Sequence, residues 1–272
     1  MANGFVPESL AECLELKAKR SLTPYAGGTD LMIEEDRGGQ YLFLHKIPEL
    51  KRIREDDDNL YFGAACTFTE LLESALAPAI LKAALSRIAA PAIRNTGTIG
   101  GNIGNGSAKA DSALIFFVTD SALKLSGSKG ERLVPIQDFY LGRKKLDLQP
   151  DELISEVRMP KKWLSKYDYQ KIGARKSLAI SRLSFAGLFA EENGAITHCA
   201  VAFGAVSDVI IRRKDLDSLL IGKTIPDAKA AKSAYIKAYE EAIVPIRGRV
   251  SAEYRKETCL NLLKDFLNKM GI

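Results

Sequence analysis

The sequence lacks a long hydrophobic run. Its longest uninterrupted apolar stretch, Ala113 to Val118, falls far short of the ~20 residues that a helix needs to cross a bilayer. The first residues, Met1 to Ser9, also lack the basic region and the apolar core of a secretory signal. We therefore expect a cytoplasmic protein with no membrane span.

Cysteine and histidine are scarce. The sequence holds four cysteines and two histidines, which are Cys13, Cys66, Cys199, Cys259, His45 and His198. No CxxC pair is present and no histidine has ligand spacing, so we expect no metal ion or iron–sulfur cluster on this chain and interpret the cysteines as buried apolar residues. No histidine is placed beside a serine or cysteine nucleophile, which excludes recognisable acyl-transfer chemistry.

An excess of one charge sign is also missing. The net charge of +5 arises from 39 basic and 34 acidic side chains that are mixed along the chain, so no broad basic surface is expected. Short basic clusters at 143–145, 161–162 and 212–214 are interpreted as solvated turns or helix ends. Nucleic acid is therefore not an expected partner.

Glycine, by contrast, is concentrated in one stretch. Residues 95–112 contain five glycines among serine, threonine and asparagine, namely Gly97, Gly100, Gly101, Gly104 and Gly106. Glycine has no Cβ, so backbone N–H groups can approach an anion closely and the chain can adopt positive φ angles. The stretch predicts a ligand-binding loop; the alternative is a surface loop whose glycines form turns and whose polar side chains cap backbone groups.

A second glycine-rich segment, Thr23–Leu31, contains Gly27-Gly28 and precedes apolar residues. Two such loops between apolar elements indicate one large ligand that is held from two sides. Neither loop has the Walker A spacing, and the glycines at 101, 104 and 106 reverse the Rossmann spacing. Without a Walker lysine or a Mg²⁺ site, the pattern favours capture of a diphosphate within a dinucleotide over phosphoryl transfer.

The remaining pattern predicts an α+β chain. Strands are predicted at 41–45, 60–64, 123–125, 132–134, 153–159 and 167–175, and a hairpin pairs 184–190 with 195–206 across Asn193-Gly194. Helices are predicted at 7–20, 67–76, 78–87, 214–220, 226–241 and 252–270, and Asp111 and Ser112 are expected to cap a buried segment at 113–119. A ligand-binding N-terminal part to about residue 160 would precede a C-terminal lobe of antiparallel strands and then helices.

Three motifs taken together resemble the FAD-binding subunit of molybdenum hydroxylases. They are Ala26–Leu31, then Thr98–Asn102 with Asp111 following, and late in the chain Arg249–Arg255. The family includes xanthine dehydrogenase and the medium subunit of aerobic carbon monoxide dehydrogenase. The resemblance covers essentially the whole chain, and the two glycine loops in tandem are its specific part.

The resemblance implies the domain organisation. Residues 1–160 would form the vanillyl-alcohol-oxidase-type (PCMH) FAD-binding fold, built from two α/β subdomains at about 1–57 and 58–160. Residues 161–272 would form the C-terminal domain of these FAD subunits, an antiparallel sheet with helices. The Arg249–Arg255 run would begin the last helix.

The resemblance also implies the cofactor-binding residues. They are Pro24, Tyr25, Ala26, Gly27, Gly28, Thr29, Asp30, Leu31, Ala89, Thr98, Ile99, Gly100, Gly101, Asn102, Asp111, Leu153 and Lys171. The two loops would wrap the FAD diphosphate with backbone N–H groups, to which Thr29 and Thr98 could add hydroxyls and Asn102 an amide. Asp111 would bind a ribityl or ribose hydroxyl, and its alternative role is helix capping.

The last two of these residues lie outside the loops. Leu153 matches an apolar contact of the flavin. Lys171 matches a basic position that could counter negative charge on the flavin or its phosphates, and its alternative is a solvated strand residue. Ala89 is the weaker match among the residues carried over.

The implied function is an electron relay. A partner subunit would hydroxylate a substrate at its molybdenum cofactor, with purines such as xanthine as the first expectation. Electrons would pass through the [2Fe–2S] clusters of an iron–sulfur subunit to the FAD bound here, and then to NAD or another acceptor. No side chain of this chain need act as an acid or base.

Two alternatives stay open. One is a self-contained flavin reductase or oxidase, like the cell-wall sugar-nucleotide reductase that shares this fold. The other is a non-catalytic assembly or nucleotide-binding module. The substrate that is hydroxylated, the final acceptor and the subunit stoichiometry depend on other chains.

Overall fold

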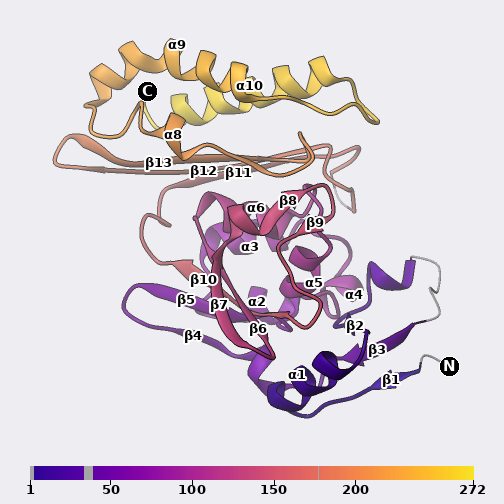
Figure 1. The fold of residues 1–272 in the computed structure, drawn as a ribbon. Helices are drawn as coiled ribbons and strands as arrows, with labels where there is room; N and C mark the ends of the chain where they lie inside the picture. Colours follow the sequence, from indigo (N-terminus) through magenta and orange to yellow (C-terminus); the bar gives the residue numbers. More distant parts are fainter. Residues whose placement is uncertain (1–2, 34–38, 177) are drawn as a thin grey trace. The chain divides into compact units, whose positions relative to one another are not determined.

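The chain forms two compact units, each assembled from three segments. The computed structural model describes residues 3–33, 39–176 and 178–272. Unit 1 contains Met1–Pro78, Ala89–Gly106 and Asp120–Lys161, and unit 2 contains Ala79–Ile88, Ser107–Thr119 and Lys162–Ile272. Two helical segments from the first half of the sequence thus fold with its C-terminal part (Figure 1). The domain boundary expected at residue 160 stays a prediction.

A three-stranded parallel sheet carries the start of unit 1. Its strands lie in the order β1 (Gly4–Phe5), β3 (Gln40–Phe43) and β2 (Leu22–Tyr25), with the short helices η1 (Leu31–Ile33) and η2 (Pro48–Lys51) nearby in sequence. The predicted first helix is confirmed as α1 (Leu10–Lys19). It begins later than predicted because the Ser9 hydroxyl caps it, accepting a hydrogen bond from the Glu12 N–H at 3.2 Å.

A five-stranded sheet of antiparallel pairs forms the rest of the unit 1 scaffold. Its order is β4 (Ile53–Glu55), β5 (Asn59–Gly63), β10 (Leu153–Pro160), β6 (Ala122–Gly127) and β7 (Gly130–Pro135). The strands predicted at 60–64, 123–125, 132–134 and 153–159 are confirmed. The side chains of Phe62 in β5, Leu123 in β6 and Val157 in β10 are fully buried, as the alternation of side chains along a half-buried strand requires.

Helix α2 (Phe68–Glu73) confirms the predicted capping box. The Glu70 N–H donates to the Thr67 hydroxyl at 3.1 Å, and the Thr67 N–H donates to the Glu70 carboxylate at 2.7 Å. The unit is completed by α4 (Pro91–Arg94), α7 (Ile136–Phe139) and the small hairpin of β8 (Tyr140–Gly142) and β9 (Lys145–Leu146).

The glycine-rich stretch is partly helical, which corrects the prediction of an open loop. Helix α5 (Ile99–Gly104) is capped by the Thr98 hydroxyl, which accepts a hydrogen bond from the Gly101 N–H at 3.1 Å. Its two isoleucines are fully buried. Gly100 lies so close to Ala64 that a Cβ would come within 2.6 Å of the alanine Cβ. Burial and close approach therefore outweigh the low helix propensity of glycine.

A four-stranded antiparallel sheet organises unit 2. Its order is β11 (Tyr167–Ile172), β12 (Leu183–Glu192), β13 (Ala195–Gly204) and β14 (Ile211–Arg212). The predicted hairpin is confirmed, because Asn193 and Gly194 adopt φ angles of 53° and 78° at its turn. The strand predicted at 167–175 ends at Ile172.

Helices contact this sheet from both faces (Figure 1). Helices α9 (Ile225–Ala242) and α10 (Ala252–Lys269) cover one face, α3 (Ala79–Leu85) and α6 (Asp111–Val118) contact the other, and α8 (Lys214–Asp217) is a single turn. All five overlap predicted helical or buried segments, although α6 begins two residues before the segment predicted at 113–119 and α9 extends one residue beyond 226–241 at each end. Gly187 of β12 lets Phe266 of α10 approach, since a Cβ there would come within 2.7 Å of the phenyl ring.

The predicted burial of the cysteines is confirmed, and one basic cluster is corrected. All four cysteines are buried, with free thiols. Arg212 is not solvated: its side chain is 3% exposed and forms an ion pair with Asp217, to which the hydroxyls of Tyr235 and Tyr239 also donate. Within the described ranges, every helix is too short or too polar to span a membrane.

Candidate cofactor-binding site

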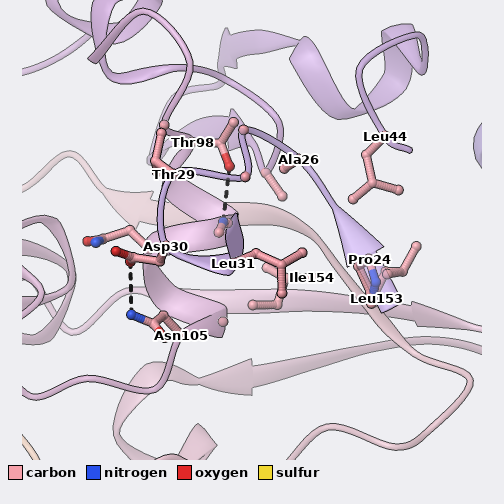
Figure 2. Close-up of a pocket in the computed structure, with 18 of the residues that line it drawn as sticks. Pro24, Ala26, Thr29, Asp30, Leu31, Leu44, Thr98, Asn105, Leu153 and Ile154 are labelled. Carbon is pink, nitrogen blue, oxygen red and sulfur yellow. Dashed lines mark hydrogen bonds between the residues drawn. The ribbon is translucent and has the colours of Figure 1, made fainter. Parts of the chain in front are cut away.

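A pocket of unit 1 brings the two glycine-rich segments together. It has a volume of about 340 Å³ and is formed by the segment after β2, by α5 and by the start of β10 (Figure 2). Most of the predicted cofactor-binding residues line it, namely Pro24, Ala26, Gly27, Gly28, Thr29, Asp30, Leu31, Thr98, Gly100, Gly101, Asn102 and Leu153.

The pocket has two chemically different walls. One wall consists of glycine, threonine and asparagine from the two glycine-rich segments. The other is apolar and includes Leu31, Leu44, Leu153 and Ile154, which Figure 2 shows as sticks. Among the described residues that line it, Asp30 alone carries a charge. Of the described lining residues, backbone and hydroxyl groups are therefore the ones that would hold an anionic ligand.

The first loop contains backbone N–H groups that have no acceptor among the described residues. None of the N–H groups from Ala26 to Asp30 donates a hydrogen bond to any residue that the structure describes. Gly27 is needed there, because a Cβ would lie 1.9 Å from the Thr96 carbonyl oxygen. Gly28 has a φ of 68° and lies against the ring of Tyr25. All five residues line the pocket, and an anion-binding loop likewise consists of residues whose N–H groups the fold leaves without an acceptor.

In the second segment, four of the five N–H groups from Thr98 to Asn102 are not free, which corrects a prediction. The N–H groups of Ile99 to Asn102 are already engaged: they donate to Cys66, to Ala64 and to the hydroxyl and carbonyl oxygens of Thr98 at 2.8–3.1 Å. The start of α5 therefore contributes the open surface over Gly101, where a Cβ would meet only the Thr98 hydroxyl, at 2.9 Å. Its backbone N–H groups cannot wrap a diphosphate in this arrangement.

A hydrogen bond ties the two segments together. The Asn105 amide donates to the Asp30 carboxylate at 2.9 Å, as the second dashed line in Figure 2 shows. Asn105 lines the pocket but was not predicted as a site residue. Its position between Gly104 and Gly106, at the end of the glycine-rich stretch, is the signal that could have indicated it.

Several other lining residues were also missed. They are Thr23, Leu44, Ala64, Phe68, Gly97, Gly104, Leu148 and Ile154. The apolar ones are indistinguishable in sequence from ordinary core residues, since nothing local indicates that one face of the side chain borders a cavity.

Three predicted residues of unit 1 lie outside the pocket lining. Ile99 is fully buried. The Tyr25 ring packs against Tyr41 and Phe43, with ring centroids 5.7 and 5.0 Å away. Ala89 has a φ of 41°, and its carbonyl accepts a hydrogen bond from an arginine of α4 at 2.8 Å.

Asp111 and Lys171 belong to unit 2, where they bind each other. The Lys171 ammonium lies 2.8 Å from the Asp111 carboxylate, and both side chains are buried. The Ser181 hydroxyl donates to the other carboxylate oxygen at 2.6 Å. The alternative role of Asp111 as a helix cap is wrong, because α6 has Ala110 at its N-cap and no side-chain cap. The alternative of a solvated Lys171 is wrong as well.

Comparison with known protein families covers nearly the whole chain. Residues 2–162 match the FAD binding domain in molybdopterin dehydrogenase, and residues 168–270 match the CO dehydrogenase flavoprotein C-terminal domain.

Individual relatives agree with these families. The xanthine dehydrogenase FAD-binding subunit of Escherichia coli O157:H7 is 30% identical over 275 residues, covering 96% of this chain and 92% of the relative. The nicotinate dehydrogenase FAD-subunit of Eubacterium barkeri is 28% identical and covers 96% and 93%. Carbon monoxide dehydrogenase from Hydrogenophaga pseudoflava has a matching chain with a TM-score of 0.89 and 26% identity, covering 98% of this chain and 96% of that one.

These matches confirm the predicted α+β fold, the flavoprotein assignment and the oxidoreductase class. They do not bear on individual site residues. The chain belongs to the family of FAD-binding subunits of molybdopterin dehydrogenases.

Proposed function

We propose that this chain holds FAD in the unit 1 pocket and relays electrons from a partner's iron–sulfur clusters to NAD or another acceptor. Bound FAD would supply the chemistry, because a flavin accepts electrons singly or in pairs. The partner would carry the molybdenum cofactor, as expected for relatives named dehydrogenase subunits. A purine substrate is supported by the relatives named as xanthine dehydrogenase FAD-binding subunits and by a caffeine dehydrogenase subunit.

The N–H groups from Ala26 to Asp30, none of which donates to a residue that the structure describes, carry this proposal. A dinucleotide contains a diphosphate, and successive backbone donors bind such an anion without a cation. The hydroxyls of Thr29 and Thr98 line the same pocket and can add donors. The apolar wall with Leu44, Leu153 and Ile154 would exclude water from the ligand's carbon surface.

The same pocket offers little acid–base chemistry. Asp30 is its one ionisable lining side chain within the described residues, and it is held by Asn105. The chain's own contribution is therefore to bind, orient and shield the cofactor, which is what an electron relay requires. The site of substrate hydroxylation would belong to the partner.

The visible absorption spectrum of the purified chain tests the proposal, with the released cofactor identified by mass. Gly101→Asp places a carboxylate at the pocket wall, and Gly101→Ala is its matched steric control. Gly101 is the third residue of α5, where a negative charge stabilises the helix, so the variant should stay folded. Repulsion between two anions should weaken FAD binding by about 100-fold or more.

The outcomes separate the possibilities. Yellow wild type and Gly101→Ala chains beside a folded, colourless Gly101→Asp chain would support the site. A wild type that stays colourless after incubation with FAD would contradict it. Co-purification of a large complex with molybdenum and iron supports the relay, whereas a yellow chain that turns over alone supports a self-contained flavin reductase.

A further inference from the structure

The run Arg249–Arg255 ends in a buried arginine. Arg255 is 3% exposed and lies near the start of α10, whose N-cap is Ser251. No carboxylate in the described part of the chain forms an ion pair with it. The positive end of the helix dipole offers a cation no stabilisation either. Charge pairing therefore does not explain why this arginine is buried.

Its hydrogen bonds give the explanation. One nitrogen of the guanidinium donates to the carbonyl oxygens of Arg182 and Ala205. Arg182 directly precedes β12, and Ala205 directly follows β13. Arg255 therefore joins the two strands at the open end of the hairpin. Ala205 has a φ of 61°, which a residue with a Cβ rarely adopts unless its surroundings hold it there.

Both segments held by Arg255 contact the start of α6. The Ala205 N–H donates to the Ala108 carbonyl at 2.6 Å. Next to Arg182, the Ser181 hydroxyl donates to the Asp111 carboxylate at 2.6 Å. One buried side chain therefore fixes two separate supports of the helix end that carries Asp111.

Asp111 in turn orients Lys171. Its second carboxylate oxygen accepts a hydrogen bond from the Lys171 ammonium at 2.8 Å, and the ammonium also donates to the Arg87 carbonyl at 2.8 Å. These contacts all lie within unit 2. The path from Arg255 to the ammonium thus runs through Ser181 and one carboxylate.

We propose that Arg255 is a positioning residue for the Asp111–Lys171 pair. It touches neither member, but it fixes Ser181 and Ala205, which hold the start of α6. A neutral side chain of similar length would fill the space without fixing the two carbonyl groups. The geometry of this pair follows from contacts within unit 2 and does not rest on the proposed function.

Trace acetylation of the full chain without FAD tests this proposal. The Lys171 side chain is 9% exposed and should react slowly, while Lys229 on the exposed surface of α9 gives the reference rate. In Arg255→Met, the Lys171 rate should rise by about tenfold, because losing a hydrogen bond from a charged donor shifts local opening by that order. Mass spectrometry of the peptides measures both rates.

A control variant separates a loss of stability from a loss of positioning, and a second variant tests the same path independently. Leu263→Ala removes a fully buried side chain from the same helix and destabilises unit 2 without touching these carbonyls, so Lys171 should react as in the wild type. Ser181→Ala keeps Arg255 and removes one hydroxyl, and it should also raise the Lys171 rate. This second variant tests the proposal even if Arg255→Met does not fold.

The contrary results are equally defined. A wild-type Lys171 rate in folded Arg255→Met would overturn the proposal. An equal rise in Leu263→Ala would show a general loss of stability instead, and an unchanged rate in Ser181→Ala would remove the path through Asp111. Because no FAD is present, each result stands apart from the test of the cofactor site.

Discussion

At the scale of single residues, the glycines of the pocket differ in what they tolerate. A Cβ on Gly27 would lie 1.9 Å from the Thr96 carbonyl oxygen, so the backbone itself would have to move. A Cβ on Gly104 would meet nothing closer than the Ile154 side chain at 3.7 Å. Glycines that line the same pocket therefore serve different purposes.

This difference predicts opposite effects on stability. Gly27→Ala should destabilise unit 1 by about 3 kcal/mol or more, because main chain must shift. Gly104→Ala should stabilise it by about 0.5–1 kcal/mol, because alanine loses less backbone entropy in a helix. Urea denaturation of both variants measures the two changes, and equal effects would show that the close approach at Gly27 is not a constraint.

Residue types alone predicted only part of the site. The pattern Gly27-Gly28 and the threonines indicated an anion-binding loop, and the loop lines the pocket. The sequence did not indicate that the Asp111 carboxylate binds Lys171 and Ser181, since these residues are 60 and 70 positions away from it in the sequence. Such pairings have no local signal, because neither backbone geometry nor periodicity couples positions so far apart.

At the scale of elements, Arg132 of β7 holds the segment that leads into the pocket. Its guanidinium forms two hydrogen bonds with the Glu152 carboxylate at 2.6 and 2.8 Å, one with the Asp147 carboxylate at 2.6 Å and one with the Asp147 carbonyl at 2.8 Å. The segment between these two acids contains Leu148 and is followed by Leu153, both of which line the pocket.

Stability should depend on pH through this contact. The Arg132 guanidinium lowers the pKa of the Glu152 carboxyl below its ordinary value of 4.5. A lowered pKa means that the stabilisation is present above about pH 4.5 and is lost as the pH falls through the lower, folded-state pKa. We expect a coupling of about 1 kcal/mol between Arg132→Met and Glu152→Gln at neutral pH.

A double-mutant cycle by urea denaturation at about pH 7 and about pH 3.5 measures this dependence. The coupling should shrink at the lower pH. If it is the same at both, then the carboxylate charge is not what holds the segment between β9 and β10.

Elements with strong local signals were predicted correctly. The Asn193-Gly194 turn and the Thr67 capping box are both present, because their geometry depends on residues within a few positions. Helix α5 was missed, because the contacts that stabilise it come from distant parts of the chain. The carbonyls of Ala64 and Cys66 accept its first N–H groups, and its isoleucines enter a core formed by other segments.

At the scale of the whole molecule, unit 2 draws two segments from the N-terminal half of the sequence. Helix α6 contacts β12 and β13, and all its residues are buried. Alternation places Phe185 and Val201 toward α9 and α10, while Leu188 and Ala200 face the other side of the sheet and are equally buried. That second face needs a cover that lies outside residues 162–272.

The C-terminal segment should therefore not fold by itself. Burying one large apolar side chain contributes about 1.5–3 kcal/mol, and a domain retains only about 5–15 kcal/mol of net stability. Residues 162–272 alone should show no cooperative thermal transition by circular dichroism. A chain that adds 79–88 and 107–119 through glycine–serine linkers should regain one, whereas a cooperative transition of the short fragment would support a domain boundary near residue 160.

By itself, the sequence determined the α+β class, the order of most strands and helices, the buried cysteines and the two glycine-rich segments that line one pocket. These features follow from the periodicity of apolar residues, from turn-forming residues and from the missing Cβ of glycine, all of which act over a few residues. Only the tertiary structure decided two further features, which hold for the residues that it describes. The N–H groups of the first loop have no acceptor there while those of α5 are occupied, and Arg255 is buried without a carboxylate partner. The reason is physical: whether a donor is free, or a charge is paired, depends on groups that the fold brings from distant parts of the chain.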